Sequence, residues 1–196
     1  TVAQITDVHV GPTIKRGYLQ AIVTRVNALE ADMVAITGDL VDGRVPELAA
    51  HVAPLAQLQS RHGSYFVTGN HEYYSGAQAW VTELRRLGLR VLMNEHVVLH
   101  HEGDGQTAAL VVAGVADWSA HHFDEAHRSD PHAAIAGGRA LRRFRHQHGL
   151  LEGAEVGQLH GRVPEEREHA EHVRRRELLV GRLLVDIFPF GMRYRI

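Results

Sequence analysis

Residues 33–42 read MVAITGDLVD, an apolar run that passes directly into a glycine and two aspartates. The uncharged part, residues 33–37, predicts a short buried strand because β-branched and aliphatic side chains dominate it. Asp39 and Asp42 then predict an acidic loop at the carboxyl end of this strand. In α/β proteins, strand ends of this kind are where ligands bind.

Polar loops also follow the strands predicted before and after this stretch, at residues 2–6 and 64–68. Their side chains are carboxylates, imidazoles and a carboxamide, contributed by Asp7, His9, Asn70 and His71. Amphipathic helices alternate with the three strands, at residues 15–30, from 46 onward and at 78–87. This alternation predicts an α/β fold with a parallel, helix-covered sheet. The carboxyl ends of parallel strands meet at one edge, so we expect the three loops to form one site.

The three loops together predict a centre for two divalent metal ions. The ligands that we assign are Asp7, His9, Asp39 and Asn70. Asp7 and His9 alternate along an extended segment and are assigned to the first metal, while Asp39, from the middle loop, is expected to bridge both. The amide oxygen of Asn70 would be a neutral ligand of the second metal. Oxygen and nitrogen ligands without sulfur suit Mn, Fe or Zn.

His71 is the predicted catalytic group beside these metals. It would protonate the leaving oxygen of a phosphoester or stabilise charge on the phosphoryl oxygens in the transition state. Asp42 or Glu72 would orient its ring, and we assign Asp42 as the catalytic partner. The nucleophile would be a hydroxide activated by the metals. Taken singly, each motif has a structural alternative, such as a turn or a helix cap by Asn70.

The bulk composition is that of an ordinary globular protein. With 196 residues, 44% of them apolar and 22% charged, the chain is predicted to form a single domain, 1–196. The formal net charge of -2 gives no reason to expect a nucleic-acid partner. Cysteine is absent, which excludes disulfides, and no apolar run is long enough to span a bilayer. Because the sequence starts at Thr1 on a strand-like run, we expect it to be a fragment of a longer protein.

Longer segments around the motifs resemble one bacterial branch of the calcineurin-like metallophosphoesterase superfamily. These segments are DVHVGPT at 7–13, ITGDLVDG at 36–43 and GNHEYY at 69–74, together with NEH at 94–96 and GVAD at 114–117. The resemblance covers residues 1–137 and implies a four-layer α/β/β/α sandwich, a dinuclear metal centre and a phosphoester substrate. This branch often carries membrane-spanning helices before the catalytic domain. The resemblance therefore implies membrane association through a missing N-terminal segment, and a cytoplasmic location if there is no such anchor.

Residues 139–186 depart from the family pattern. The family has a strand that ends in a ligand histidine there, followed by a Gly-His-x-His loop, and this stretch contains neither. His146, His148 and His160 lack that context and are interpreted as exposed polar residues. Two explanations stay open: a frameshift or corrupted gene model, and a disordered segment. Under both, the fold is expected to be incomplete or irregular after about residue 138.

Three functions are compatible with these observations. The first is metal-dependent hydrolysis of a phosphoester, impaired in this chain because ligands from the second half are missing. The second is a non-catalytic metal-binding or interaction domain that retains half a site. The third is a basic, partly disordered arm at 139–182 for nucleic acid or anionic lipid, although the glutamates interleaved in it argue against this function.

Overall fold

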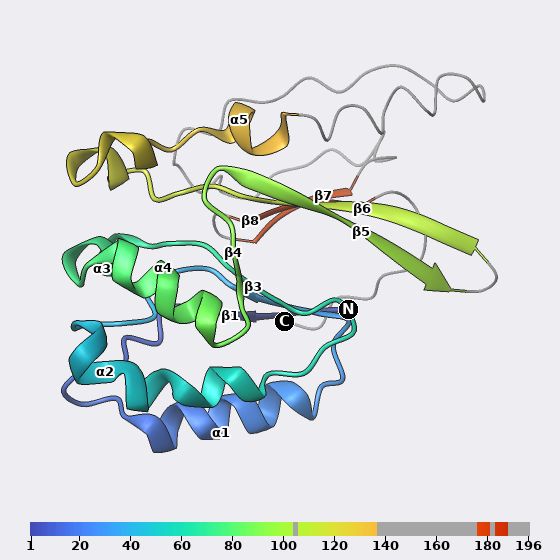
Figure 1. Ribbon diagram of the computed structural model, residues 1–196. Helices are drawn as coiled ribbons and strands as arrows, with labels where there is room; N and C mark the ends of the chain where they lie inside the picture. Colours follow the sequence, from blue (N-terminus) through green and yellow to red (C-terminus); the bar gives the residue numbers. More distant parts are fainter. Residues whose placement is uncertain (104–105, 137–175, 181–182, 188–196) are drawn as a thin grey trace, which may run out of the picture.

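The computed structural model describes residues 1–103, 106–136, 176–180 and 183–187 (Figure 1). The strands are β1 (Val2–Ile5), β2 (Met33–Ile36), β3 (Ser64–Phe66), β4 (Arg90–Val91), β5 (Glu95–Gly103), β6 (Gln106–Gly114), β7 (Arg176–Val180) and β8 (Leu183–Ile187). The α-helices are α1 (Arg16–Asn27), α2 (Val45–Val52), α3 (Asn70–Tyr74), α4 (Ala77–Arg86) and α5 (Pro131–Ile135). Short 3-10 turns are η1 (Ala53–Gln57), η2 (Ala120–His122) and η3 (Glu125–His127).

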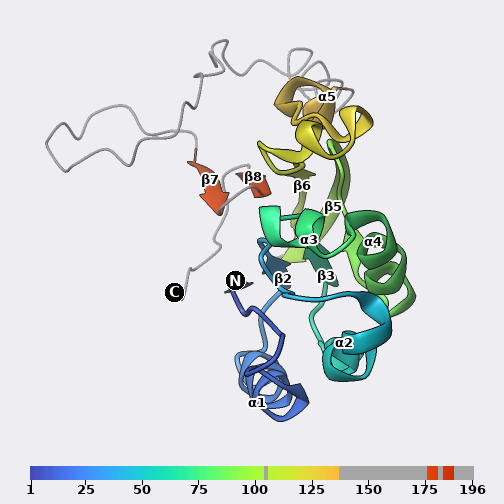
Figure 2. The same ribbon diagram turned by 90° about the vertical axis from the view of Figure 1, so that its left-hand side faces the viewer.

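The first four strands form a parallel sheet in the order β1-β2-β3-β4. Val2 pairs with Met33, and Val34 pairs with Ser64 of the next strand. Helices α1, α2 and α4 cover one face of this sheet (Figure 2). The alternation of strands and helices predicted from the sequence is confirmed.

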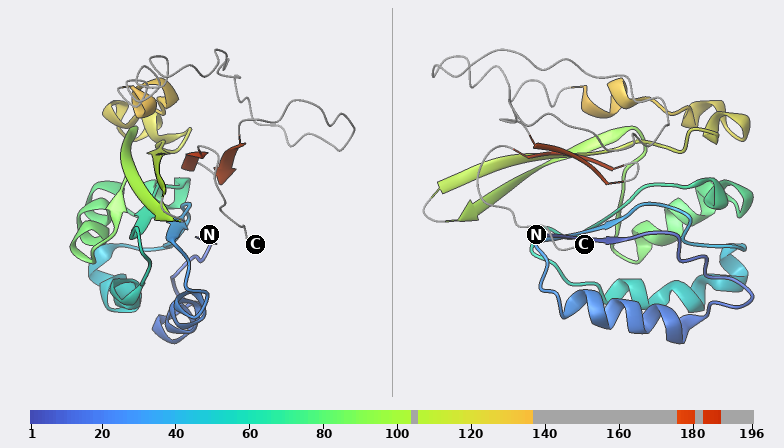
Figure 3. Two further views of the ribbon diagram at one scale, coloured as in Figure 1. Left: turned by 90° about the vertical axis from the view of Figure 1, so that its right-hand side faces the viewer. Right: turned by 180° about the vertical axis from the view of Figure 1, so that it is seen from behind.

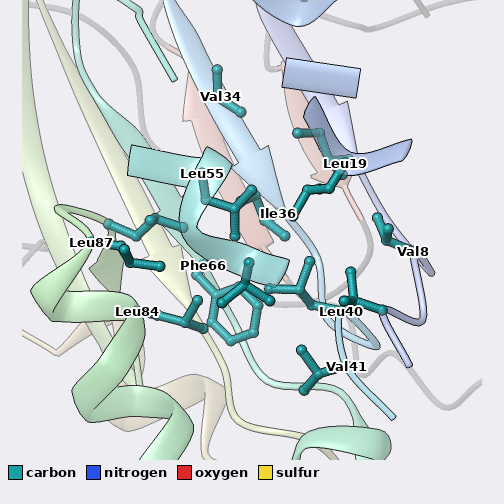
Figure 4. Packing of buried hydrophobic residues seen from close by; sticks show 14 of the residues in the cluster. Val8, Leu19, Val34, Ile36, Leu40, Val41, Leu55, Phe66, Leu84 and Leu87 are labelled. Carbon is teal, nitrogen blue, oxygen red and sulfur yellow. The ribbon is translucent and has the colours of Figure 1, made fainter. Parts of the chain in front are cut away.

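Every residue of β2 is buried, because both faces of the parallel sheet are covered. Val34 and Ile36 point to the helical face (Figure 4). There they pack in one core with Phe66 of β3, Leu19 of α1 and Leu84 of α4. This core anchors the strands whose ends carry the polar loops.

Met33 and Ala35 point to the opposite face, where a second sheet packs against the first. The core between the sheets contains Val2, Met33, Ala35, Tyr65, Val67, Leu92, Leu99, Leu110 and Val112. The second sheet is antiparallel, in the order β5-β6-β8-β7. Helix α5 lies on its outer face (Figure 3), where His96 Nδ1 is 2.7 Å from the Ala134 carbonyl oxygen. The layers thus follow the α/β/β/α order that the resemblance implies.

Strands β7 and β8 extend the second sheet beyond β6. Leu110 pairs with Ile187 of β8, and Ile187 pairs with Arg176 of β7. Of the segment 139–186, which the sequence marks as irregular, only these two strands are described. The frameshift and disorder explanations, and the arm at 139–182, otherwise concern residues outside the described part of the chain.

A histidine pair joins the two sheets at the end opposite the polar loops. His62, just before β3, places its Nε2 atom 2.9 Å from Nδ1 of His101 on β5. Burial of the His62 ring, together with the positive charge of His101 and Arg61, lowers the pKa of His62 from its ordinary value of 6.5. The neutral ring is therefore favoured in the folded protein.

Acid is expected to destabilise the fold through this histidine. Because its pKa is lowered on folding, the unfolded chain binds the proton more readily, so the free energy of unfolding falls as the pH drops below about 6.5. Between about pH 7.5 and about pH 5.5, we expect the melting temperature to fall more in the wild type than in His62→Gln. Equal falls in both proteins, measured by thermal unfolding, would show that His62 does not contribute.

Candidate metal centre

The three polar loops meet at the carboxyl ends of β1, β2 and β3, on the left in Figure 1. The first two loops continue side by side after their strands end. His9 N donates to the Asp39 carbonyl at 3.1 Å, and Val10 N donates to the Leu40 carbonyl at 2.8 Å. The topology therefore brings together residues that are about thirty positions apart in the sequence.

Two glycines hold the second and third loops in backbone contact. Gly38 has a φ of 92°, and a Cβ atom there would lie 2.5 Å from Gly69 N. A Cβ atom on Gly69 would lie 2.0 Å from Asp39 Oδ1, so neither position has room for a side chain. The Asp39 carboxylate consequently lies at the first turn of α3, where its Oδ1 accepts the backbone N–H of His71 at 3.1 Å.

Three of the predicted ligands have a left-handed backbone conformation. The φ angles are 51° at Asp7, 51° at His9 and 50° at Asp39. Such angles are uncommon outside glycine, and strained residues of this kind cluster at functional sites. The extended segment predicted for Asp7 and His9 is wrong, because β1 ends at Ile5 and the backbone turns beyond it. These turns, and not strand alternation, direct the two side chains.

Asp42 binds both imidazoles of the centre through one oxygen atom. Its Oδ1 lies 3.0 Å from His9 Nδ1 and 2.6 Å from His71 Nδ1, and the two rings are 4.5 Å apart in an edge-to-face arrangement. The hydrogen bond to Asp42 raises the pKa of His9 from 6.5, against the effect of burial. Burial alone would raise the pKa of Asp42, but its hydrogen bonds to His9 and His71 outweigh this and lower it. Asp42 therefore orients both rings, with each Nε2 on the side away from it.

The side-chain amide of Asn70 lies beside the Asp39 carboxylate. Its hydrogen-bonding surroundings assign the amide nitrogen as the donor to the two Asp39 oxygens, at 3.1 and 3.2 Å. The amide oxygen would face a cation at Asp39 only if the side chain turned over. The fit to a divalent metal therefore rests on the oxygen and nitrogen donors of His9, Asp39 and His71.

Glu72 stabilises the second and third loops through hydrogen bonds to their backbone. Its side chain is completely buried. Its carboxylate accepts the backbone N–H groups of Gly69 at 2.6 Å, Leu40 at 2.8 Å and Asp39 at 3.0 Å. Burial raises the pKa of Glu72, while these N–H donors oppose the rise. Glu72 thus positions the backbone of Asp39 and does not contact His71 through any hydrogen bond found in the described residues.

This role of Glu72 is one that the sequence interpretation missed, since it considered Glu72 only as a partner for His71. A signal was present: Glu72 lies three residues after Gly69, at the position where an acidic residue reaches back to the first N–H of a helix. The hydrogen bonds that Glu72 accepts from the loop after β2 could not be predicted from that spacing.

Among the described residues, His9, Asp39 and His71 form a group whose ligand atoms lie within 4.8 Å of one another. The sequence predicts His9 and Asp39 as metal ligands and His71 as the catalytic group; Asp7 and Asn70 are not in this group. The side chain of Asp7 is 60% exposed, and its Oδ1 lies 3.9 Å from His9 Nε2. The segment after residue 138, where the resemblance implies further ligands but the sequence has no matching motif, lies mostly outside the described part of the chain.

A cavity of about 470 Å³ opens beside the imidazoles. It is lined by Asp42, Gly43, Arg44, Glu47, His71, Tyr74 and Ser75. His71 and Asp42 therefore belong both to the donor cluster and to the wall of a space that a substrate could enter.

Comparisons with known proteins agree with this geometry. A sequence model of the calcineurin-like phosphoesterase family matches residues 1–179. A Bos taurus protein named transmembrane protein with metallophosphoesterase domain is 40% identical over 144 residues, which are 69% of this chain and 32% of that protein. A protein of the same name from Danio rerio is 45% identical over 93 residues, 47% of this chain and 21% of that protein. An uncharacterized metallophosphoesterase from Helicobacter pylori is 43% identical over 95 residues, 48% of this chain and 26% of that protein.

The chain spans about a fifth to a third of the length of these curated relatives. The family match includes all three polar loops and most of the chain. Phosphoester hydrolysis with metal ions is the chemistry of this family, and the cluster of His9, Asp39 and His71 agrees with it. The chain therefore belongs to the calcineurin-like phosphoesterase family.

Proposed function

We propose that this chain hydrolyses a phosphoester with two divalent cations, drawn from Mn, Fe and Zn, at the centre described above, and that this activity is impaired because the further ligand motifs of the family are missing after residue 138. The observation that carries the proposal is the group formed by His9, Asp39 and His71, whose ligand atoms lie within 4.8 Å of one another. When bound, such cations activate water as a nucleophile near neutral pH and stabilise charge on the phosphoryl oxygens.

Each residue of the centre has a distinct role in this proposal. Asp39 would be shared between the cations, with Asp7 and His9 on one side and Asn70 on the other. Asp42 holds His9 by Nδ1, which leaves His9 Nε2 free to bind a cation. Asp42 also holds His71 by Nδ1, so His71 Nε2 lies on the opposite side of the ring, where it would give a proton to the leaving oxygen.

A domain that binds one metal without catalysis is the second candidate function. Its support is that His9, Asp39 and His71 form a single three-donor group, whereas Asp7 is mostly exposed. In this case His71 would be a ligand and would not transfer a proton. The number of metals bound and the presence of hydrolysis separate the two candidates.

Membrane association is proposed from the relatives. Two of them are named transmembrane proteins, and this chain covers only a part of each. Within the described residues, no helix has both the length and the apolar character needed to cross a bilayer.

The central test is metal content together with hydrolysis. The purified chain would be loaded with Mn²⁺, desalted and examined by elemental analysis, and hydrolysis of p-nitrophenyl phosphate and bis(p-nitrophenyl) phosphate would be followed. We expect two metals per chain and hydrolysis that a chelator removes and added Mn²⁺ restores, because activation of water depends on the cations. One metal without hydrolysis would support the second candidate. No bound metal would contradict both.

A further inference from the structure

The cavity beside His71 is larger than a phosphoryl group requires. Its volume of about 470 Å³ lies in the range of about 300 to 1,000 Å³ that is typical of small-molecule sites. Its lining passes from Asp42 and His71 to Arg44 and Glu47 at the start of α2. If the phosphoryl group of a substrate lay at His71, the remaining part of the substrate molecule would lie in this cavity.

The residues that line the cavity argue against two kinds of substrate group, an acyl chain and a second anionic group. None of the residues that line the cavity is aliphatic, so the apolar surface available to an acyl chain would be the Tyr74 ring and the methylene groups of Arg44 and Glu47. Arg44 and Glu47 carry opposite charges, and Glu47 Oε2 accepts the backbone N–H of Arg44 at 3.2 Å. This balance of charge does not favour a second anionic group. A neutral group with hydrogen-bonding edges suits the cavity better.

Tyr74 supplies an aromatic surface in this cavity. The residue is 64% exposed although it belongs to the short helix that carries His71. Its ring centre lies 5.6 Å from that of His71 and 5.5 Å from that of Phe123, at interplanar angles of 73° and 70°. Both neighbours stand nearly perpendicular to the Tyr74 ring and are not stacked on it. These two contacts therefore hold the Tyr74 ring in position, and they leave part of its surface open for stacking with a planar group.

Buried hydrogen bonds hold the backbone at Gly43 and at Ser75, two of the residues that line the cavity. Trp80, which is fully buried, donates from Nε1 to the Gly43 carbonyl at 2.9 Å. The Ser75 hydroxyl donates to the Val41 carbonyl at 3.3 Å. These bonds fix the backbone on two sides of the cavity, so little ordering is needed when a ligand enters.

We propose that this cavity binds the nucleoside part of a nucleoside phosphate, with the base stacked on Tyr74 and its polar edges or ribose hydroxyls facing Arg44 and Glu47. The inference rests on the proposed function, because it takes the phosphoryl group to lie at His71. Tyr74 is the specificity-determining residue in this arrangement.

The test compares AMP with ribose 5-phosphate, which carry the same sugar and phosphate and differ only by the base. Binding of each to the Mn²⁺-loaded full chain would be measured by calorimetry. We expect AMP to bind about ten-fold more tightly or better, since stacking of one base on one aromatic side chain contributes on this scale. Tyr74→Ala is expected to reduce the AMP preference to nearly one-fold, whereas Tyr74→Phe keeps the ring and the preference.

Tyr18→Ala is the matched control, because Tyr18 is also an exposed tyrosine, at 57%, but lies on α1 outside the cavity. It is expected to keep the AMP preference. Equal binding of AMP and ribose 5-phosphate to the wild type, binding of neither, or an unchanged preference in Tyr74→Ala would overturn the nucleoside site. An AMP preference that depends on Tyr74, in a chain that hydrolyses no phosphoester, would uphold this site and refute the proposed hydrolysis.

Discussion

Replacing Asp39 with asparagine is expected to abolish hydrolysis and to weaken Mn²⁺ binding by at least about a hundred-fold. Removing a residue that only hydrogen-bonds a metal ligand can already weaken metal binding by about a hundred-fold, so losing the ligand charge itself should cost at least as much. Asp39 contributes to the only clustered donor group among the described residues, together with His9 and His71. The substitution removes the negative charge but keeps the shape of the side chain. Calorimetry with Mn²⁺ and the value of kcat/KM would measure the two effects.

The control for this variant is Asp130→Asn. Asp130 caps α5 by accepting the backbone N–H of Ala133 at 2.8 Å, and asparagine caps helices equally well. This variant is expected to bind Mn²⁺ like the wild type. If Asp39→Asn kept normal metal affinity while its melting temperature was unchanged, Asp39 would not be a ligand and the assignment of the centre would be wrong.

The largest effect on stability is expected at Glu72. In Glu72→Gln, the new amide nitrogen would face either the backbone N–H groups of Gly69 and Asp39 or that of Leu40, a contact between donors in a fully buried place. Breaking a buried polar network of this kind costs about 3 to 5 kcal/mol. Urea unfolding of the metal-free protein should show this loss as a lower midpoint. For a domain whose total stability is about 5 to 15 kcal/mol, that is a large fraction.

Glu83→Gln provides the comparison for Glu72. Glu83 also lies on a helix with little exposure, but its carboxylate binds the Arg86 side chain, which is 65% exposed. Glu83→Gln should lose clearly less stability than Glu72→Gln, because water can replace the Arg86 side chain as a hydrogen-bonding partner. Similar urea midpoints for Glu72→Gln and the wild type would mean that the loops do not depend on the Glu72 carboxylate.

The strands and the loops that follow them could be predicted because they depend on local patterns. The run MVAIT forms β2 at Met33–Ile36 and is buried on both faces, as an apolar strand in a parallel sheet must be. Parallel strands end at a common edge, so the convergence of the polar loops also follows from the order of strands and helices.

Side-chain directions in the loops could not be predicted in the same way. The left-handed turns at Asp7, His9 and Asp39 depend on contacts between the loops, such as the bond from His9 N to the Asp39 carbonyl. The contact of Gly38 with Gly69 joins positions 31 residues apart, since 69 − 38 = 31. Such contacts exist only after the sheet has formed, and no local pattern encodes them.

The amino-acid sequence by itself determined the parallel sheet and the family, because these follow from periodicity and from short motifs within single loops. Tertiary structure alone decided that Asp42 binds both His9 and His71, that Glu72 holds the backbone of Asp39, and that Tyr74 borders a cavity. Each of these features joins side chains from different loops. Their distances are set by how the strands and helices pack, which a sequence pattern does not specify.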